Sequence, residues 1–373
     1  MRHKYLYIIA LCSVLMGMVA CNTSQEALPP VDEASRIYLG ANVGSQVVVR
    51  APYAPANGSN TPSASSPLDV SVWASTTDGV FPNSSLNGSN NDDGIVAIHT
   101  RAHFTGGDPQ LLGEAVYPKG NALVYFVGLH PKSNDWTTDD GTQARFTISG
   151  KEDVMFAPKI SGKYGIDFEN SPTFHFRHLL TYLRIEMVAD MTEDAIPKRE
   201  EVSEAWGAIK RLTIKSRNKI VVDLNSNSSY AAFEEELPID MPLYHKDSDT
   251  PFPATNDFYI PTTITEVAYV LCEPVEAEYT HIVNGEDVLK PEYTLHLETD
   301  QRTIEIPIDL KLNSGTAESS YFTGSTIARQ FTILLNFKMG DIISVAATIA
   351  LDASSDWHTH GTGSKELGEE DLM

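Results

Sequence analysis

Histidine pairs are the residues of this sequence that come nearest to the spacing of a metal or catalytic site. His99 and His103 are four residues apart, but their surroundings predict strand and loop rather than the helix on which such spacing forms a metal pair. His175 and His178 are three apart on a predicted strand, so they face opposite sides of it. The sequence therefore predicts structural or surface histidines and no metal site.

The motifs of nucleophilic and nucleotide chemistry are absent from the sequence. It contains no GxSxG elbow, no HExxH pair, no Walker loop and no GxGxxG turn after a strand. Asn91, Asp93 and Gly94 resemble part of a calcium loop, but Thr100 stands where such a loop closes with Glu. With 50 acidic residues, no catalytic pair can be picked out by spacing. We therefore predict a protein that is not an enzyme and that needs no cofactor.

Cys21 is the residue whose surroundings predict a covalent modification. Residues 2–4 are basic, and residues 5–20 form an apolar segment that is too short to remain as a membrane span. Ala20 precedes Cys21, and this junction resembles a bacterial lipobox, in which the cysteine is acylated and becomes the first mature residue. We predict a signal peptide at 1–20 and a lipidated tether, with palmitate or a similar acyl chain, at 21–35. The alternative is an ordinary signal peptide and a chance cysteine.

The charge of the chain excludes some partners. The formal net charge is −23. Removal of the signal takes away Arg2 and Lys4 and no acid, which leaves 25 basic against 50 acidic side chains, or −25. Such a protein lacks the basic surface that nucleic acid requires. It is also repelled by anionic membrane surfaces, so a lipid at Cys21 is needed to hold it at the outer membrane.

Cysteine usage adds one further constraint. Of the three cysteines, Cys12 leaves with the signal and Cys21 is the predicted lipid site. Only Cys272 remains, so the mature chain has no intrachain disulfide. Cys272 ends the apolar run at 268–272, which predicts a buried, inert thiol.

Alternation of apolar and polar residues at period two predicts strands along most of the mature chain. Helical periodicity is weak, and turn residues separate the strands at fairly regular intervals, so the fold class is all-β with β-sandwich architecture. The predicted strands lie at 36–43, 47–49, 68–74, 122–129, 174–177, 182–187, 209–215, 219–224, 257–260, 266–271, 293–298, 303–310, 330–338 and 342–351.

Composition shifts divide the chain. A charged stretch at 190–208 predicts a connection that includes a short helix. We predict an N-terminal β-sandwich at 36–190, a C-terminal β-sandwich at 191–357 and an acidic tail at 358–373 that does not resemble a strand.

Several short runs, taken in order, resemble the fimbrillins of Bacteroidales, the type V pilins. The most specific is FHFRHLL at 174–180 followed by YLRI at 182–185. Others are YFV at 125–127 with Pro131, DVMFA at 153–157, and FTG at 322–324 with FTILL at 331–335, 342–349 and Trp357. The resemblance covers most of the mature chain.

The resemblance implies two tandem transthyretin-like β-sandwiches of Greek-key type in a lipidated precursor that is exported to the cell surface. In the major subunits of that family an Arg-specific protease cuts near the N-terminus, and the strand of a partner subunit replaces the strand that is lost. Arg50 is the position that best matches this cut, and Arg36 is the alternative. The implied partners are other fimbrial subunits, joined by strand complementation, and a ligand on a host or bacterial surface.

The alternating residues before Arg50 suit a strand that can be exchanged. An incoming strand would supply main-chain hydrogen bonds and fill a slot with its apolar side chains. An ordinary, permanent first strand is the alternative. The predicted strand-exchange residues are Ile37, Leu39, Ala41, Val43, Val47 and Val49.

The polar tail departs from the pattern of a donor strand, which favours a tip, anchor or accessory subunit over a stalk subunit. A different class of function is a lipid-anchored surface protein that binds glycan or host protein and does not polymerise. Its contact points would be exposed aromatic residues, for which the candidates are Trp73, Trp136, Trp206 and Trp357.

Overall fold

The protein is described from a computed structural model, in which 36–43 is the first described segment. The described residues are 36–43, 62–64, 66–82, 89–91, 94–106, 110–118, 122–133, 136–138, 141–163, 171–190, 196–227, 232–255, 257–277, 281–283, 286–288, 292–308, 310–312, 320–321, 324–327, 329–340, 343–349 and 362–367.

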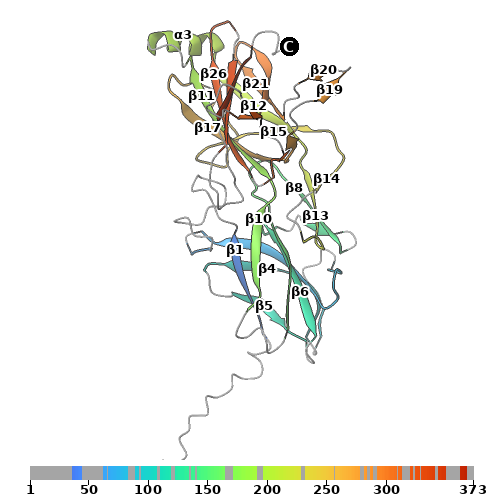
Figure 1. The fold of residues 1–373 in the computed structure, drawn as a ribbon. Coiled ribbons are helices and arrows are strands. Elements are labelled where there is room, and N and C mark those ends of the chain that lie inside the picture. Colours follow the sequence, from blue (N-terminus) through green and yellow to red (C-terminus); the bar gives the residue numbers. More distant parts are fainter. Residues whose placement is uncertain are drawn as a thin grey trace, which may run out of the picture.

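The described residues form several β-sheets and one helix, which confirms the all-β prediction (Figure 1). The largest sheet has eight strands in the order β3-β4-β2-β6-β9-β10-β1-β5. Their bounds are β3 (Ser89–Asn91), β4 (Gly94–Phe104), β2 (Leu68–Ser75), β6 (Leu123–His130), β9 (Met155–Lys163), β10 (Thr173–His178), β1 (Arg36–Val43) and β5 (Gln110–Val116).

A six-stranded sheet, β16-β17-β11-β26-β27-β28, and a four-stranded sheet, β15-β12-β21-β22, make up the other end of the molecule. The six strands are β16 (Tyr244–His245), β17 (Thr265–Cys272), β11 (Thr181–Ala189), β26 (Gln330–Phe337), β27 (Ile343–Ile349) and β28 (Thr362–Leu367). The four are β15 (Ile239–Pro242), β12 (Ile209–Ser216), β21 (Tyr293–Thr299) and β22 (Thr303–Ile308).

Smaller sheets complete the described strands. They are β14 (Ala232–Phe233), β13 (Lys219–Asp223), β8 (Gln143–Thr147) and β7 (Thr137–Thr138) in one sheet, and the pairs β18 (Glu276–Ala277) with β25 (Gly324–Ser325), β19 (His281–Val283) with β20 (Glu286–Val288), and β23 (Lys311–Leu312) with β24 (Ser320–Tyr321).

Two central strands of the eight-stranded sheet, β2 and β6, have buried side chains on both faces. On β2, Trp73 belongs to the larger core cluster, whereas Val70 and Val72 belong to a second cluster on the opposite face. β6 alternates in the same way, with Val127 in one cluster and Phe126 in the other. Burial on both faces explains why the run at 122–129 is apolar at nearly every position. β5 is the last strand in the order of this sheet, yet it lies against β4, near the other end, without pairing with it. The sheet is therefore curled.

β10 and β11 carry the chain from one end of the molecule to the other. Only Leu179 and Leu180 separate them, yet β10 pairs within the eight-stranded sheet and β11 pairs with β17 and β26 in the six-stranded sheet. β11, which the predicted boundary at 190 assigns to the N-terminal part, thus shares a sheet with strands after 240. The division into two transthyretin-like domains remains a prediction.

The larger core cluster extends from the eight-stranded sheet into a packed sandwich at the upper end of Figure 1. Leu183 and Ile185 from β11 and Ile333 from β26 share one cluster with Leu212 from β12 and Leu295 from β21. Side chains at alternate positions of both sheets therefore face each other, as the period-two pattern predicts.

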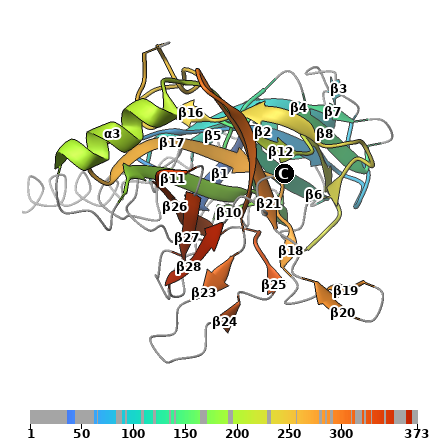
Figure 2. The same ribbon diagram turned by 90° about the horizontal axis from the view of Figure 1, so that it is seen from above.

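The connection at 190–208 contains α3 (Ile196–Trp206), as predicted. Figure 2 shows it beside the six-stranded sheet, next to β11. The indole of Trp206 anchors the helix, because it is buried, donates a hydrogen bond to the carbonyl of Lys338 at 2.9 Å and packs against Phe337. Among the described residues, no helix has the length and apolar character of a membrane span.

Two expectations are revised. The strand predicted at 257–260 is reduced to an isolated bridge between Phe258 and Ile209. Residues 362–367, inside the predicted acidic tail, form β28 antiparallel to β27. The edge of β27 offers unpaired backbone groups, and polar residues can satisfy them as well as apolar residues do.

Candidate functional site

β1 is an inner strand of the eight-stranded sheet. It runs parallel to β10, with Ala41 opposite Phe174 and Val43 opposite Phe176. On its other side it pairs antiparallel with β5, with an irregularity between Arg36 and Tyr38. Removal of β1 would therefore expose a hydrogen-bonding edge on both neighbours.

The side chains of β1 alternate as the sequence predicts. Ile37, Leu39, Ala41 and Val43 are each at most 2 % exposed and belong to the second core cluster, together with Phe174 and other residues from β2, β6 and β10. The predicted strand-exchange residues Val47 and Val49 lie outside the described residues.

β1 and β10 approach each other closely at Gly40. Its N–H donates to the carbonyl of Pro172 at 2.9 Å. A Cβ atom at Gly40 would lie 2.6 Å from the Thr173 hydroxyl, closer than packed side chains allow. Glycine is therefore needed at this position by space and not by an unusual backbone angle.

The two predicted cleavage positions differ in what they would release. Arg36 is exposed and is the first residue of β1, so every buried residue of the strand follows it. A cut after Arg36 would leave 37–43 in the sheet, whereas a cut after Arg50 would sever the whole strand from the rest of the chain. Arg50 and the predicted lipid site Cys21 lie outside the described residues.

A buried hydrogen bond between side chains joins two of the runs that resemble fimbrillins. His178, at the end of β10, donates from Nδ1 to Oδ1 of Asp153, which precedes β9, at 2.9 Å, and the two side chains are 0 % and 1 % exposed. Leu179 N–H also donates to the carbonyl of Val154. Both residues lie in runs that carry the family resemblance, but the sequence does not predict their contact, because they are 25 positions apart. The pair fixes the point where β10 passes into β11.

His130 lies beside this pair. Its Nδ1 donates to the carbonyl of Asp69 at 2.7 Å, which assigns the ring proton to Nδ1. Burial lowers the pKa of His130 because it penalises the imidazolium, and the charge of Asp153 opposes this shift.

The other histidines have structural or surface environments. His99 is buried and stacks on Trp73 at 4.1 Å between ring centroids, whereas His103 is exposed and contacts Asp69 at 2.9 Å. His175 is exposed and His178 is buried, so the two face opposite sides as predicted. Among the described residues no cluster could hold a metal ion.

The tryptophans suggested as ligand contacts do not lie at the surface. Trp73, Trp136 and Trp206 are at most 1 % exposed, and Trp357 lies outside the described residues. Size and burial give these three tryptophans core roles, so a binding surface cannot use them as contact points. Cys272 is also buried, and burial raises the pKa of its thiol, as expected for an inert cysteine.

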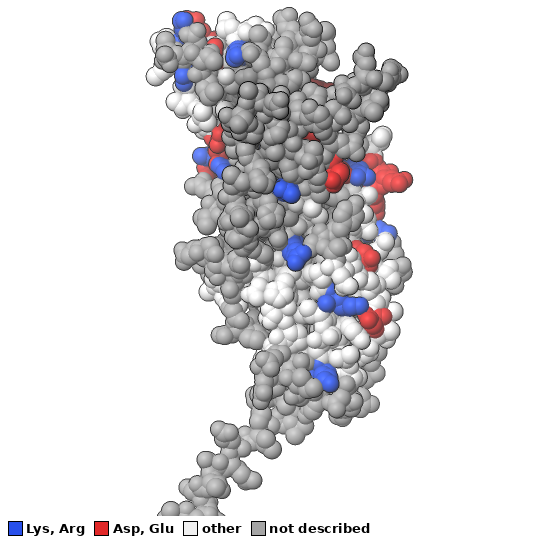
Figure 3. Space-filling view, in the orientation of Figure 1, with Lys and Arg blue, Asp and Glu red and all other residues white. Residues whose placement is uncertain are grey.

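Charged side chains of both signs are mixed on the described part of the face that Figure 3 shows. On the face in Figure 3, acidic and basic groups lie next to each other, and the described part of that face has no large basic patch. Ion pairs such as Arg217 with Glu273 and Lys210 with Asp300 account for part of this mixing.

No family model matches the chain. No curated protein matches it either. Among solved structures, it is similar to a candidate cell adhesion protein from Bacteroides ovatus, with 15% identity, a TM-score of 0.43, and coverage of 86% of this chain and 97% of that one. A candidate cell adhesion protein from Bacteroides uniformis has 14% identity and a TM-score of 0.43, and the match covers 84% of this chain and 98% of that one. A fimbrial protein from Bacteroides vulgatus has 14% identity and a TM-score of 0.39, and the match covers 89% of this chain and 99% of that one. At these scores, the likenesses carry no weight for function.

Proposed function

We propose that this protein is a subunit of a cell-surface fimbria with a role in adhesion. It is exported as a precursor that is lipidated at Cys21 and held at the outer membrane, and it assembles when protease cleavage frees β1 for replacement by the strand of a partner subunit. The observation that carries the proposal is the position of β1, an inner strand with buried alternate side chains that lies wholly before Arg50. Arg50 is thus the cleavage position that suits exchange, and Arg36 does not release the strand.

The energetics support a coupling between cleavage and replacement. Ile37, Leu39 and Val43 are fully buried, and burial of such side chains contributes about 1.5–3 kcal/mol each, or about 5–9 kcal/mol in total. A folded domain is stable by only about 5–15 kcal/mol. A chain without β1 would therefore be close to unfolding, and an incoming strand would be bound tightly.

The C-terminal strands favour a terminal subunit. β27 is paired on both sides, with β26 and with β28, inside its own sheet. The chain then has a slot to accept a strand but no unpaired donor among its described strands. This arrangement suits a tip, anchor or accessory subunit better than a repeating stalk subunit.

Controlled proteolysis tests the proposal. The purified Cys21→Ser precursor is treated with an Arg-specific protease, and the new N-terminus is sequenced. We expect a cut after Arg50 that Arg50→Lys prevents and that the control Arg36→Lys does not.

The cut chain is then separated from its fragment in mild denaturant, and a synthetic peptide of residues 36–50 is added. We expect the peptide to bind and to restore the unfolding midpoint. A peptide with Leu39→Asp and Val43→Asp should do neither, because it would bury two charges. Absence of a cut in the folded protein, or a cut chain that no peptide restores, would overturn strand exchange at this site.

A further inference from the structure

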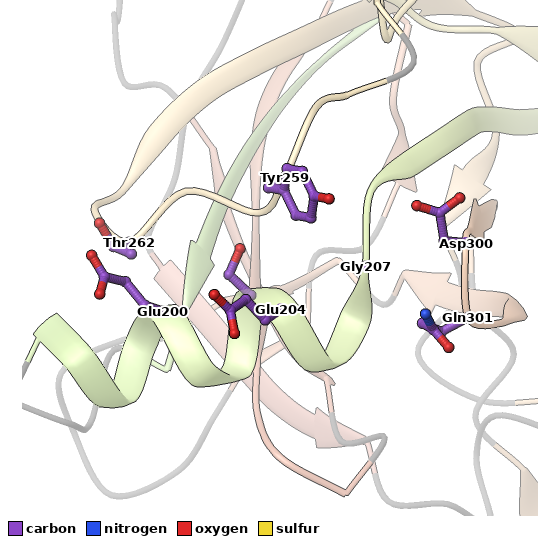
Figure 4. Close-up of a pocket in the computed structure, with 8 residues that line it drawn as sticks. Glu200, Glu204, Gly207, Tyr259, Thr262, Asp300 and Gln301 are labelled. Atoms are coloured by element: carbon purple, nitrogen blue, oxygen red, sulfur yellow. The ribbon is translucent and has the colours of Figure 1, made fainter.

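A polar groove lies at the end of the six-stranded sheet, beside α3. It has a volume of about 540 Å³, within the usual range of about 300–1,000 Å³ for small-ligand sites. Residues from three separate segments line it, as Figure 4 shows. They include Glu200, Glu204, Tyr259, Thr262, Asp300 and Gln301.

One wall of the groove is held close to the end of α3 by Gly207. This residue has φ +74°, a backbone conformation that favours glycine, and a Cβ here would lie 3.0 Å from Gln301 and 3.1 Å from Asp300. Asp300 N–H donates to the carbonyl of Ala208 at 2.9 Å. The turn between β21 and β22 is therefore fixed against the helix.

The opposite wall is also tied to α3. The Ser203 hydroxyl donates to the carbonyl of Ile260 at 2.7 Å, and the Arg199 guanidinium donates to the carbonyl of Thr262 at 2.9 Å. These bonds position the loop that carries Tyr259. The groove is thus preformed, which reduces the entropy lost when a ligand binds.

Tyr259 supplies an apolar surface inside this polar groove. It is 51% exposed, one of the few large apolar side chains of the described residues that face solvent. In Figure 4 its ring lies between Glu200 and Thr262 on one side and Asp300 and Gln301 on the other. An open aromatic face ringed by hydroxyl, amide and carboxylate groups fits a ligand with apolar C–H faces and many hydroxyls.

The charges of the groove select against an anionic ligand. Asp300 is paired with Lys210 at 2.9 Å. The guanidinium of Arg302 lies over the Trp206 ring and donates to the carbonyl of Ala205, so it is directed to the helix end. Glu200 and Glu204 add two carboxylates that accept hydrogen bonds from hydroxyls and repel acidic groups.

The groove also lies far from the start of β1. β1 runs parallel to β10, β10 continues into β11, and at the end of β11 the N–H of Ala189 donates to the carbonyl of Pro261, in the loop of Tyr259. The chain toward Cys21 leaves at Arg36, at the opposite end of this run. If the chain is anchored at Cys21, which is a part of the proposed function, the groove lies at the end of this run that is farther from Arg36, where the segment toward the anchor joins.

We propose that this groove binds a neutral glycan, with the Tyr259 ring stacked on a sugar face and Glu200 and Glu204 accepting hydrogen bonds from sugar hydroxyls. The site itself needs no cleavage or assembly, and only its use in adhesion rests on the proposed function.

A glycan array of neutral and sialylated oligosaccharides, probed with the full Cys21→Ser chain, tests the site. We expect binding to a subset of the neutral glycans. Tyr259→Ala should weaken binding by about tenfold or more, whereas Tyr259→Phe should stay close to wild type, since the ring is kept. Glu200→Gln with Glu204→Gln should weaken neutral binding, and Leu237→Ala, a control at an exposed apolar residue that does not line the groove, should not.

Binding that Tyr259→Ala leaves unchanged, a preference for sialylated glycans, or no bound neutral glycan would overturn the proposal. Tyr259→Ala must also be cut after Arg50 and restored by the 36–50 peptide as wild type is. Loss of glycan binding can then be told apart from failure of strand exchange.

Discussion

The side chains of Asp153 and His178 are costly to bury unless they are hydrogen-bonded to each other. Two polar groups leave water, and their hydrogen bond compensates only while both partners are present. The pair lies where β9 begins and β10 ends, so it fixes the strand ends at the passage between the two sheets. We interpret it as a device that specifies this geometry.

Removal of one partner should be severe. His178→Ala leaves the Asp153 side chain buried without its donor, and we expect a loss of about 1–3 kcal/mol in the free energy of unfolding. Urea denaturation measures the loss. The matched control is His175→Ala, an exposed residue on the same strand, which should change stability by less than about 0.5 kcal/mol. Equal losses in the two variants would contradict a special role for the pair.

His130 makes stability depend on pH. Burial and the nearby charge of His178 lower its pKa from the usual 6.5, and they outweigh Asp153 and the bond to Asp69. The unfolded chain therefore takes up this proton at a higher pH than the folded chain does. As the pH falls from about 6.5 toward the folded pKa, stability is lost, and above that range this group has no effect.

Urea midpoints at pH 7.5, 6.5 and 5.5 measure this dependence. His130→Asn keeps a donor for the Asp69 carbonyl but has no proton to gain, so its midpoint should fall less on acidification than that of wild type. His175→Asn should follow wild type. If His130→Asn shows the full wild-type decrease, the dependence arises elsewhere.

At the scale of elements, the close contact between β1 and β10 is the feature most sensitive to side-chain size. We expect Gly40→Val to lower the free energy of unfolding by about 1–3 kcal/mol, because the added atoms overlap Thr173. Thr173→Ala removes the hydroxyl and methyl that would be overlapped, so the double variant should recover part of the loss. A double-mutant cycle in urea measures this coupling, and simple additivity would argue against the contact.

Alternation of apolar and polar residues predicts a strand well where one face of that strand is buried and the other is not. Ile37 to Val43 and Leu183 to Met187 lie in strands with the predicted faces inward, because period two is a property of the strand alone. Pairing partners are not encoded locally. The polar residues 362–367 lack the alternation that predicts a strand, yet they form β28. The sequence of β11 does not indicate that this strand pairs with β17 and β26 rather than within the sheet of β10.

The candidate sites follow the same rule. The inward residues of β1 can be read from the sequence, but the groove beside α3 cannot, because Tyr259 and Gln301 meet only through the fold. The four tryptophans were the visible aromatic candidates, and three of them are core residues. A tyrosine in a loop carries no sequence signal that separates it from the other tyrosines.

At the scale of the whole molecule, the net charge of −23 means that the protein surface itself does not bind an anionic membrane, so membrane attachment can be tested separately from folding. An anionic chain has no electrostatic affinity for an anionic membrane, so the proposed attachment would depend on the acyl group. In cells labelled with an acyl precursor, Cys21→Ser should lose the label and shift the protein from the membrane fraction to the medium. Cys272→Ala is the matched control and should keep both, because Cys272 is buried. Label that persists in Cys21→Ser would disprove lipidation there.

The short connection between β10 and β11 also affects how the molecule would respond to a pulling force. A pull between Arg36 and the end of β11 acts along the strands, since β1 and β10 run parallel and β11 runs parallel to β26. Loaded in this direction, a strand cannot separate one hydrogen bond at a time but must slide past its neighbours with many bonds breaking together. We therefore expect the molecule to resist this pull more than a pull across the strands, and drag from flowing liquid would act in this direction if the chain is tethered before Arg36 as proposed.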